Sequence, residues 1–361
     1  MILTKIDRYI IKKFLGTFFF SIALIIAISI VFDFSENVDE FIEKKAPTEA
    51  IIFDYYLNFI PHFANLFSPL FIFISVIFFT SKMASNTEII AILASGVSFN
   101  RLLRPYFIAS LFLGILSYYL NNFLIPESNK ERIEFRYTYI KNPIRNKDRN
   151  IHLKLNSNSY AYMESYNASR DIGSKFSLER FDDEGKLRYK LLADFVRWDS
   201  SKNKWTIQNY YERHIYDDHE DIKRGYTLDT TLQMKVKDFE RWGEEKEMLN
   251  YWELNAKIAE EEFQGDRHAV IFKIEKYKRQ AFPFASVVLT FIGVAIASRR
   301  VRGGIGLHLA FGLGLSFTYI LFMKVSQTFS TNGSLDPMIA MWIPNVVFGF
   351  IALYLLRKAP K

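Results

Sequence analysis

A single carboxylate stands on a face of small residues in segment 81–98. Glu88, Ala91 and Ser95 share one face at helical spacing, and Gly96 is a typical residue at which a helix ends. Ser85 and Glu88 have the spacing of a capping box, so we expect a short helix over about 85–96. Such a helix could dock into a groove on another protein, or Glu88 could simply cap it.

Basic residues also follow two long apolar stretches. Lys44 and Lys45 come after the first stretch, and Arg132 and Arg136 come after the third. Lysine and arginine pair with phosphate groups, so an anionic lipid headgroup would explain these residues. The alternative is interfacial snorkelling with pairing to nearby glutamates.

The sequence lacks the common catalytic motifs. It has 0 Cys, which excludes disulfides and thiolate chemistry. The P-loop, zinc-protease and nucleophile-elbow motifs do not occur. His214 and His219 flank two aspartates, where a solvated turn is favoured over a metal site. We therefore expect no enzyme, no bound metal and no cofactor.

Six apolar segments are long enough to be considered membrane helices. They cover 14–32, 55–80, 106–125, 281–298, 303–323 and 337–356. Pro61 and Pro69 interrupt the second of them. In the fifth, Gly306, Gly312 and Gly314 predict close helix contact.

The short loops and tails on one side of these helices are strongly basic. They hold 13 Lys and Arg, whereas Asp7 and Glu88 are their only acids. The positive-inside rule makes this side cytoplasmic, with both termini on it. The net charge of +7 is thus a signal of topology and not of nucleic-acid binding.

An insert of about 150 residues separates the third and fourth helices, outside the cytoplasm. Alternating segments at 160–165, 173–181, 187–198, 205–216 and 226–236 are separated by polar turns. This pattern predicts an antiparallel sandwich or jelly roll. A charged helix over 238–264 should return the chain to the membrane. We expect three parts: 1–126, with the first three membrane helices; 127–270, with the β domain; and 271–361, with the last three helices.

Several short motifs resemble one family over nearly the whole chain. They are Ile6-Asp7-Arg8-Tyr9, the loop from Glu88 to Gly96, Phe282-Pro283-Phe284, Trp342-Ile343-Pro344-Asn345 and Tyr354-Leu355-Leu356-Arg357. The stretch Asn158–Ser165 is similar to the first strands of the family's jelly roll. The family is the LptF/LptG (YjgP/YjgQ) permeases, and the Asp-Arg-Tyr opening looks more like LptG.

The resemblance implies an inner-membrane permease of the lipopolysaccharide exporter in Gram-negative bacteria. It implies an LptB ATPase dimer, a second LptF/LptG-type permease and the periplasmic proteins LptC and LptA as partners. Glu88, Ala91, Ser95 and Gly96 match the helix that couples to the ATPase. Lys44, Lys45 and Arg136 match basic positions that face lipid A phosphates.

Two departures from the family concern the basic residues. Asp33 lies where some members have a lysine, and a second basic position falls on Ile133, with Arg132 beside it. These departures predict that the basic residues facing the lipid are arranged differently in this chain, in a way suited to a lipid with fewer phosphates.

Two other protein classes compete with this interpretation. Mechanotransmitting proteins of the FtsX or MacB kind have four spans, whereas six are predicted here. An intramembrane lipid enzyme would need acids, histidines or serines facing one another within the spans, and none is arranged in that way.

Overall fold

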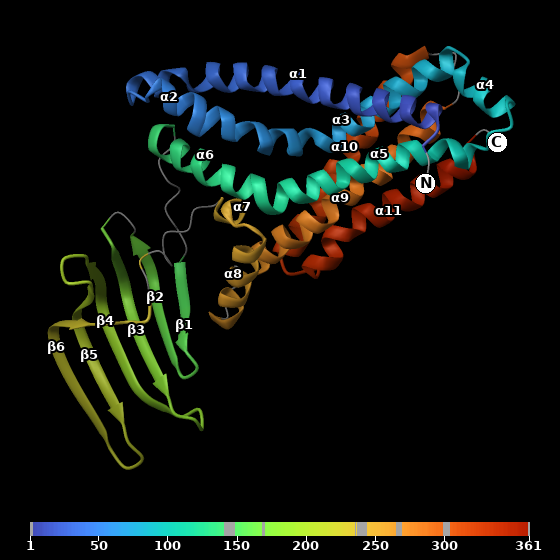
Figure 1. Ribbon diagram of the computed structural model, residues 1–361. Helices are drawn as coiled ribbons and strands as arrows, with labels where there is room; N and C mark the ends of the chain where they lie inside the picture. Colours follow the sequence, from blue (N-terminus) through green and yellow to red (C-terminus); the bar gives the residue numbers. More distant parts are fainter. Residues whose placement is uncertain are drawn as a thin grey trace. The chain divides into compact units, whose positions relative to one another are not determined.

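The computed structural model describes residues 3–140, 149–167, 170–234, 236, 244–264, 269–298 and 304–359. They belong to two compact units (Figure 1). The helical unit comprises Met1–Lys141, Glu247–Leu254 and Val270–Lys361. The β unit comprises Asn142–Lys246 and Asn255–Ala269.

Long apolar helices dominate the helical unit, and shorter helices occur in both units. The helices are α1 (Lys5–Glu43), α2 (Thr48–Ala50), η1 (Ile51–Tyr56), α3 (Leu57–Ser85), α4 (Glu88–Ala94), α5 (Phe99–Tyr119), η2 (Leu120–Leu124), α6 (Ile125–Tyr139), α7 (Glu245–Met248), α8 (Tyr251–Gln264), α9 (Ala269–Ala297), α10 (Gly304–Thr331) and α11 (Pro337–Arg357). Within the described residues, six helical segments are long and apolar enough to cross a membrane. The predicted helical membrane architecture with six spans is confirmed.

The membrane helices extend well beyond their apolar centres. α1 has 39 residues, because a capping box between Thr4 and Asp7 starts it before the apolar run begins. It ends at Glu43, and Lys45 then has a left-handed φ of 52°. The third span likewise continues from α5 through the π-helical turn η2 into α6. The apolar pattern therefore marks only part of these helices, whereas α11 coincides closely with its apolar segment 337–356.

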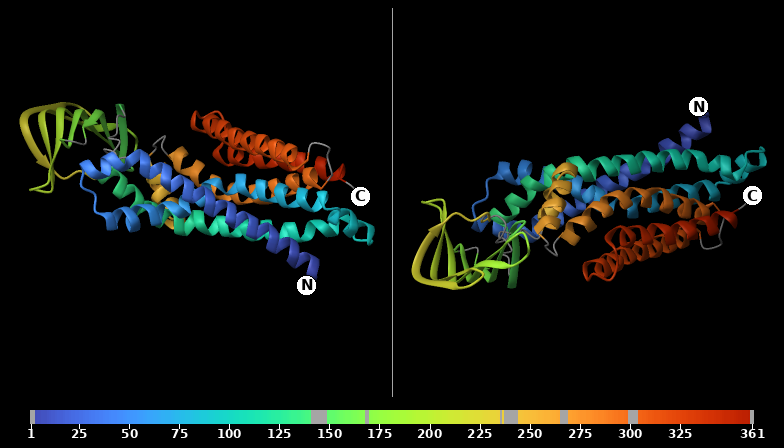
Figure 2. Two further views of the ribbon diagram at one scale, coloured as in Figure 1. Left: turned by 90° about the horizontal axis from the view of Figure 1, so that it is seen from above. Right: turned by 90° about the horizontal axis from the view of Figure 1, so that it is seen from below.

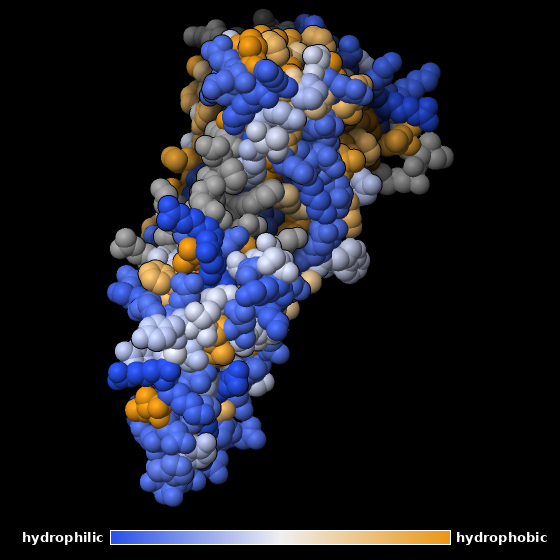
Figure 3. All heavy atoms as spheres, turned by 90° about the vertical axis from the view of Figure 1, so that its left-hand side faces the viewer, coloured by the Kyte–Doolittle hydropathy of each residue, from blue (hydrophilic) through white to orange (hydrophobic). Residues whose placement is uncertain are grey.

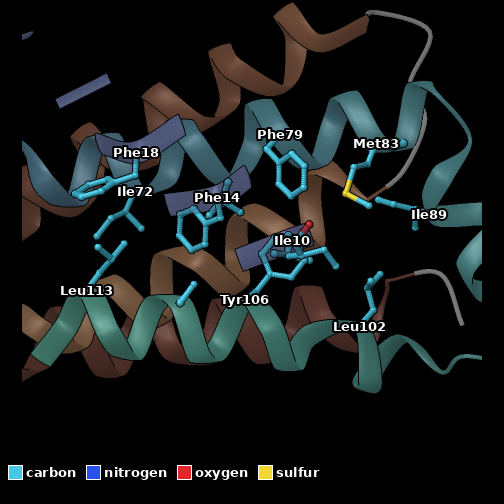
Figure 4. Packing of buried hydrophobic residues seen from close by; sticks show 14 of the residues in the cluster. Ile10, Phe14, Phe18, Ile72, Phe79, Met83, Ile89, Leu102, Tyr106 and Leu113 are labelled. Carbon is cyan, nitrogen blue, oxygen red and sulfur yellow. The ribbon is translucent and has the colours of Figure 1, made fainter. Parts of the chain in front are cut away.

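One buried stripe of α1 packs on α3 and α5. Its residues recur every four positions, as a helix face requires, and they are Ile10, Phe14, Phe18, Ile22 and Ile26. Figure 4 shows the first three beside Ile72 and Tyr106. A second core cluster joins α9, α10 and α11, and the last two of these lie side by side in Figure 2.

Close helix contact at glycine occurs at fewer positions than predicted. A Cβ at Gly312 would overlap the Ile77 side chain, so this position fits the expected role. Gly306 and Gly314 have no atom within 4 Å of an added Cβ, and for them the prediction of close contact was wrong. Gly293 on α9 instead lies tightly against α3.

The β unit contains one antiparallel sheet of six strands in sequential order. The strands are β1 (Arg149–Asn156), β2 (Ser159–Asn167), β3 (Ile172–Phe181), β4 (Leu187–Asp199), β5 (Lys204–Ile215) and β6 (Glu220–Thr230). Trp205 is fully buried, and its indole Nε1 donates to the Met234 carbonyl at 3.1 Å. The visible face of this unit in Figure 3 is largely hydrophilic.

The inserted antiparallel β domain is confirmed, with two differences in detail. β1 was not predicted. β6 begins at Glu220 and not at 226, because the antiparallel ladder with β5 already pairs Glu220 with Ile215 directly after the turn. Consecutive strands pair throughout the described residues, so these six strands follow one another in sequential order within one sheet. The predicted helix over 238–264 lies partly outside the described residues, and α7 and α8 account for its described part.

Candidate functional site

The short helix of the 81–98 segment begins later than predicted. Ser85 is the last residue of α3, and its hydroxyl donates to the Lys82 carbonyl at 2.9 Å. Thr87 then adopts a left-handed φ of 62°, and no side chain caps α4. The expected capping box between Ser85 and Glu88 was therefore wrong, because α3 continues through Ser85 and the chain turns at residues 86–87.

α4 presents its small residues and Ile90 to the surface, whereas Ile89, Ile92 and Leu93 pack on the core. Ala91, Ser95 and Gly96 are exposed, whereas Ile89 is 1% exposed and packs into the α1–α3–α5 cluster (Figure 4). Gly96 has a φ of 88°, and its amide donates to the Leu93 carbonyl at 3.0 Å. The helix thus ends at a glycine, as expected.

The half-buried Glu88 carboxylate is held by two neutral donors. The Tyr9 hydroxyl donates to Glu88 Oε2 at 3.2 Å, and Asn86 Nδ2 donates to Oε1 at 3.3 Å. Tyr9 lies on the second turn of α1, so the first residue of α4 contacts the first membrane helix. This contact was not predicted.

A second link joins the start of α1 to the start of α5. Arg101 donates through both terminal nitrogens to the two Asp7 oxygens, at 2.7 and 2.6 Å. The Asp7 side chain is 5% exposed and the Arg101 side chain is 30% exposed. Asp7 also accepts from the Thr4 amide and hydroxyl, both at 2.9 Å. The only indication of this link in the sequence was that Asp7 is an acid in an otherwise basic N-terminal segment.

Lys44 and Lys45 lie at the opposite end of α1. Lys44 caps the helix, and both side chains are exposed. Neither forms an ion pair within the described part of the chain. Phe41, one turn earlier, packs on Tyr55 and Phe135 with ring centroids 6.2 and 6.0 Å apart. Both lysines are thus exposed, one turn after the aromatic contact that joins α1, η1 and α6.

Arg132 and Arg136 lie one turn apart on α6 and point away from bulk solvent. Arg132 is 4% exposed, and its Nε donates to Asn129 Oδ1 at 3.1 Å. Arg136 is half-buried, with its guanidinium 5.9 Å from the Tyr137 ring centre. The structure places both arginines on the helix that packs against the end of α1. It gives no contact between them and the exposed lysines.

The two departures from the family pattern have structural counterparts. The Asp33 carboxylate accepts from the Tyr55 and Tyr56 hydroxyls at 3.2 and 3.1 Å. It therefore fixes η1 to α1. Ile133 is fully buried, so the basic group on that turn of α6 comes from Arg132.

Other cations near this end of the bundle are paired. Lys130 contacts Glu127 and Glu253, each at 3.0 Å. Glu275 on α9 accepts from Lys278 at 3.1 Å and from Arg279 at 3.0 Å. For these residues the pairing alternative considered from the sequence holds.

A polar cavity of about 150 Å³ lies inside the helical unit. Its wall includes Asn65, which accepts from Ser117 at 2.7 Å and donates to Asn121 at 2.9 Å. Lys278 and Arg279 also line it. The Asn65 hydrogen bonds link α3 to α5 and η2, and buried polar groups of this kind are costly to leave unsatisfied within a membrane protein.

The β unit contains a groove of about 510 Å³ with aromatic and charged walls. Lys154 lies in it, 5.2 Å from the Phe263 ring centre. His214 lies on β5, and His219 contacts Asp218 at 2.7 Å in the turn that follows. Within the described part of the chain, no three histidine, aspartate or glutamate side chains gather as metal ligands would.

Comparison with known families gives one match over nearly the full length. The family described as lipopolysaccharide export system permease LptF/LptG matches residues 8–358. No individually curated protein matches the chain. The family match includes all six apolar helices and the inserted sheet, and it does not distinguish LptF from LptG. The chain therefore belongs to the LptF/LptG family of lipopolysaccharide export permeases.

Proposed function

We propose that this chain is one permease subunit of an ABC transporter that extracts lipopolysaccharide from the outer leaflet of the inner membrane. The family match over residues 8–358 is the observation that carries this proposal. Six apolar helices and an inserted β domain fit a transporter that both holds a lipid and passes it on.

ATP hydrolysis in this proposal belongs to a separate LptB-type ATPase dimer, since the sequence has no P-loop. The docking surface is the exposed side of α4, formed by Ala91, Ser95 and Gly96 with the Glu88 carboxylate at its start. One charge on a smooth surface suits insertion into a groove that carries a basic residue.

The lipid's phosphates meet the basic residues at the other end of α1. Lys44 and Lys45 are exposed and can make the first contact. Arg132 and Arg136 lie deeper on α6, where desolvation strengthens a charge-assisted contact. A permease with these four groups binds an anionic headgroup while apolar helix surfaces contact its acyl chains.

The remaining steps require other subunits. A second LptF/LptG-type permease completes the cavity, and the β unit passes lipid to LptC- and LptA-type proteins. In this proposal α4 and both termini are cytoplasmic and the β unit is periplasmic, which the positive-inside rule supports through the basic loops. ATP is needed because burial of an acyl chain in the bilayer is worth about 0.8 kcal/mol per CH₂.

The test is photo-crosslinking of lipopolysaccharide to the complex in proteoliposomes. Each basic residue near anionic lipid contributes about 1 kcal/mol, so Lys44→Glu with Lys45→Glu should lower crosslinking by at least about tenfold. The matched control is Lys204→Glu with Lys223→Glu, which reverses two exposed lysines of β5 and β6 that form no ion pair within the described residues. Equal crosslinking by both double variants would contradict the lipid-phosphate role.

A further inference from the structure

The segment that carries α4 is held to α1 at both of its ends. We define the coupling segment as residues 88–101, which leave α3 and lead into α5. Its first residue, Glu88, accepts from the Tyr9 hydroxyl, and its last residue, Arg101, donates to Asp7. Asp7 and Tyr9 are two positions apart, so the first two turns of α1 close a ring with this segment.

The Asp7–Arg101 end of the ring is the firm one. Two parallel hydrogen bonds at 2.7 and 2.6 Å join the guanidinium to the carboxylate. A bidentate pair of this kind fixes orientation as well as distance. Asp7 is further held by Thr4, whose amide and hydroxyl both donate to it. We therefore expect the start of α5 and the start of α1 to move together.

The hydrogen bond at the Tyr9–Glu88 end is weaker, and another donor can replace the Tyr9 hydroxyl in it. Its hydrogen bond is longer, at 3.2 Å, and its donor is a neutral phenol. Tyr9 is 41% exposed, so water and partner groups have access to it. A cation on a docking protein would be a stronger partner for the Glu88 carboxylate. Glu88 can thus leave Tyr9 while Arg101 stays on Asp7.

α1 has the smallest buried share among the six described spans of this chain. Only 22% of its apolar window is buried, compared with 56% in the α3 span and 61% in α9. It is a continuous helix of 39 residues, so a tilt applied at its first turn reaches its far end, where Lys44 and Lys45 lie. Its buried apolar contacts near the coupling segment centre on the stripe that includes Ile10, Phe14 and Phe18 (Figure 4).

We propose that Asp7, Tyr9 and Arg101 are positioning residues that tie the coupling segment to α1, so that a protein docking on α4 shifts this helix. Asp7 and Arg101 transmit the movement, and Tyr9 holds Glu88 until a cationic group of the partner replaces it. The inference rests on the proposed function, because it requires an ATPase on α4.

The first test measures lipopolysaccharide released per ATP hydrolysed by the reconstituted complex. Asp7→Asn and Arg101→Gln should each lower this ratio by about tenfold, within the usual range of coupling between sites, while the ATPase still binds. The charge swap Asp7→Arg with Arg101→Asp should restore it. Arg104→Gln, an exposed arginine one turn further along α5, should behave as wild type. Unchanged ratios in Asp7→Asn and Arg101→Gln would overturn the inference.

The second test keeps Asp7 and Arg101 unchanged, so it does not depend on whether Asp7→Asn or Arg101→Gln folds. The chain has 0 Cys, so Arg8→Cys and Asn100→Cys can carry one spin label each, on exposed sites of α1 and of the Arg101 end of the coupling segment. If α1 follows the coupling segment, the distance between the labels stays constant when ATPase and an ATP analogue are added. A large change in this distance would show that α1 does not follow. A wild-type chain that binds no ATPase would instead refute the proposed function itself.

Discussion

The tight contact between α9 and α3 at Gly293 gives a quantitative prediction. A Cβ added at Gly293 would lie 2.9 Å from Val76 Cγ1 and 3.2 Å from two Phe73 ring carbons. Val76 and Phe73 are both fully buried, so neither can move without displacing other core atoms. Overpacking of this kind costs about 1–3 kcal/mol.

Helix propensity acts in the opposite direction and must be separated from overpacking. Replacing a helical glycine by alanine favours the helix by about 1 kcal/mol. Gly314→Ala on α10 measures this gain alone, because no atom lies within 4 Å of its added Cβ. Gly293→Ala should therefore be less stable than Gly314→Ala by about 1–3 kcal/mol.

The assay is thermal unfolding of both purified variants in the same detergent. Gly314→Ala should unfold at or above the wild-type temperature, and Gly293→Ala clearly below it. Adding Val76→Ala to Gly293→Ala removes the atom at 2.9 Å and should recover part of the loss. Equal unfolding temperatures for the two glycine variants would refute the tight packing described for this contact.

Three further predictions concern the β unit and the lipid. Trp205→Phe removes the donor to the Met234 carbonyl, so it should destabilise the β unit by at least about 1–3 kcal/mol, which chemical denaturation followed by far-UV circular dichroism would detect. In the turn before β4, the pKa of Asp182 is lowered from 3.8, first because the Lys186 amide donates to its carboxylate. Because its pKa is lower in the folded state, Asp182 stabilises the fold at pH values above its unfolded-state pKa, and this stabilisation is lost as the pH falls through its folded-state pKa. Asp182→Asn should therefore make the free energy of unfolding fall less steeply with pH in the acid range. An unchanged pH dependence would contradict this. Lys44→Glu alone should weaken lipopolysaccharide crosslinking less than the double reversal with Lys45→Glu, because each cation contributes separately.

The chain's architecture was largely predictable because it depends on composition over long windows. Twenty apolar residues in a row indicate a membrane helix whatever surrounds them. The helix ends were less predictable, since polar residues at both ends of α1 remain helical. The same holds for Ser85, which suits a cap but is the last residue of α3.

The contacts that organise the α4 surface could not be derived from sequence spacing. Tyr9 and Glu88 are 79 positions apart, and Asp7 and Arg101 are 94 apart. Only the packing of α1 on α3 and α5 brings them together. The available signal was indirect: Asp7 and Glu88 are the two acids among 13 cations on their side, and both are bound by α1 or α5 residues. The burial of Arg132 depends in the same way on how α6 packs.

Docking of an ATPase on α4 is best tested by purifying the tagged chain in mild detergent and identifying the accompanying proteins by mass spectrometry. We expect that a P-loop ATPase and a second six-span permease copurify, and that Glu88→Arg removes the ATPase. Asn100→Arg, an exposed residue on the first turn of α5, should retain both partners. A chain that purifies well folded but without an ATPase, or one that keeps the ATPase in Glu88→Arg, would contradict docking on α4.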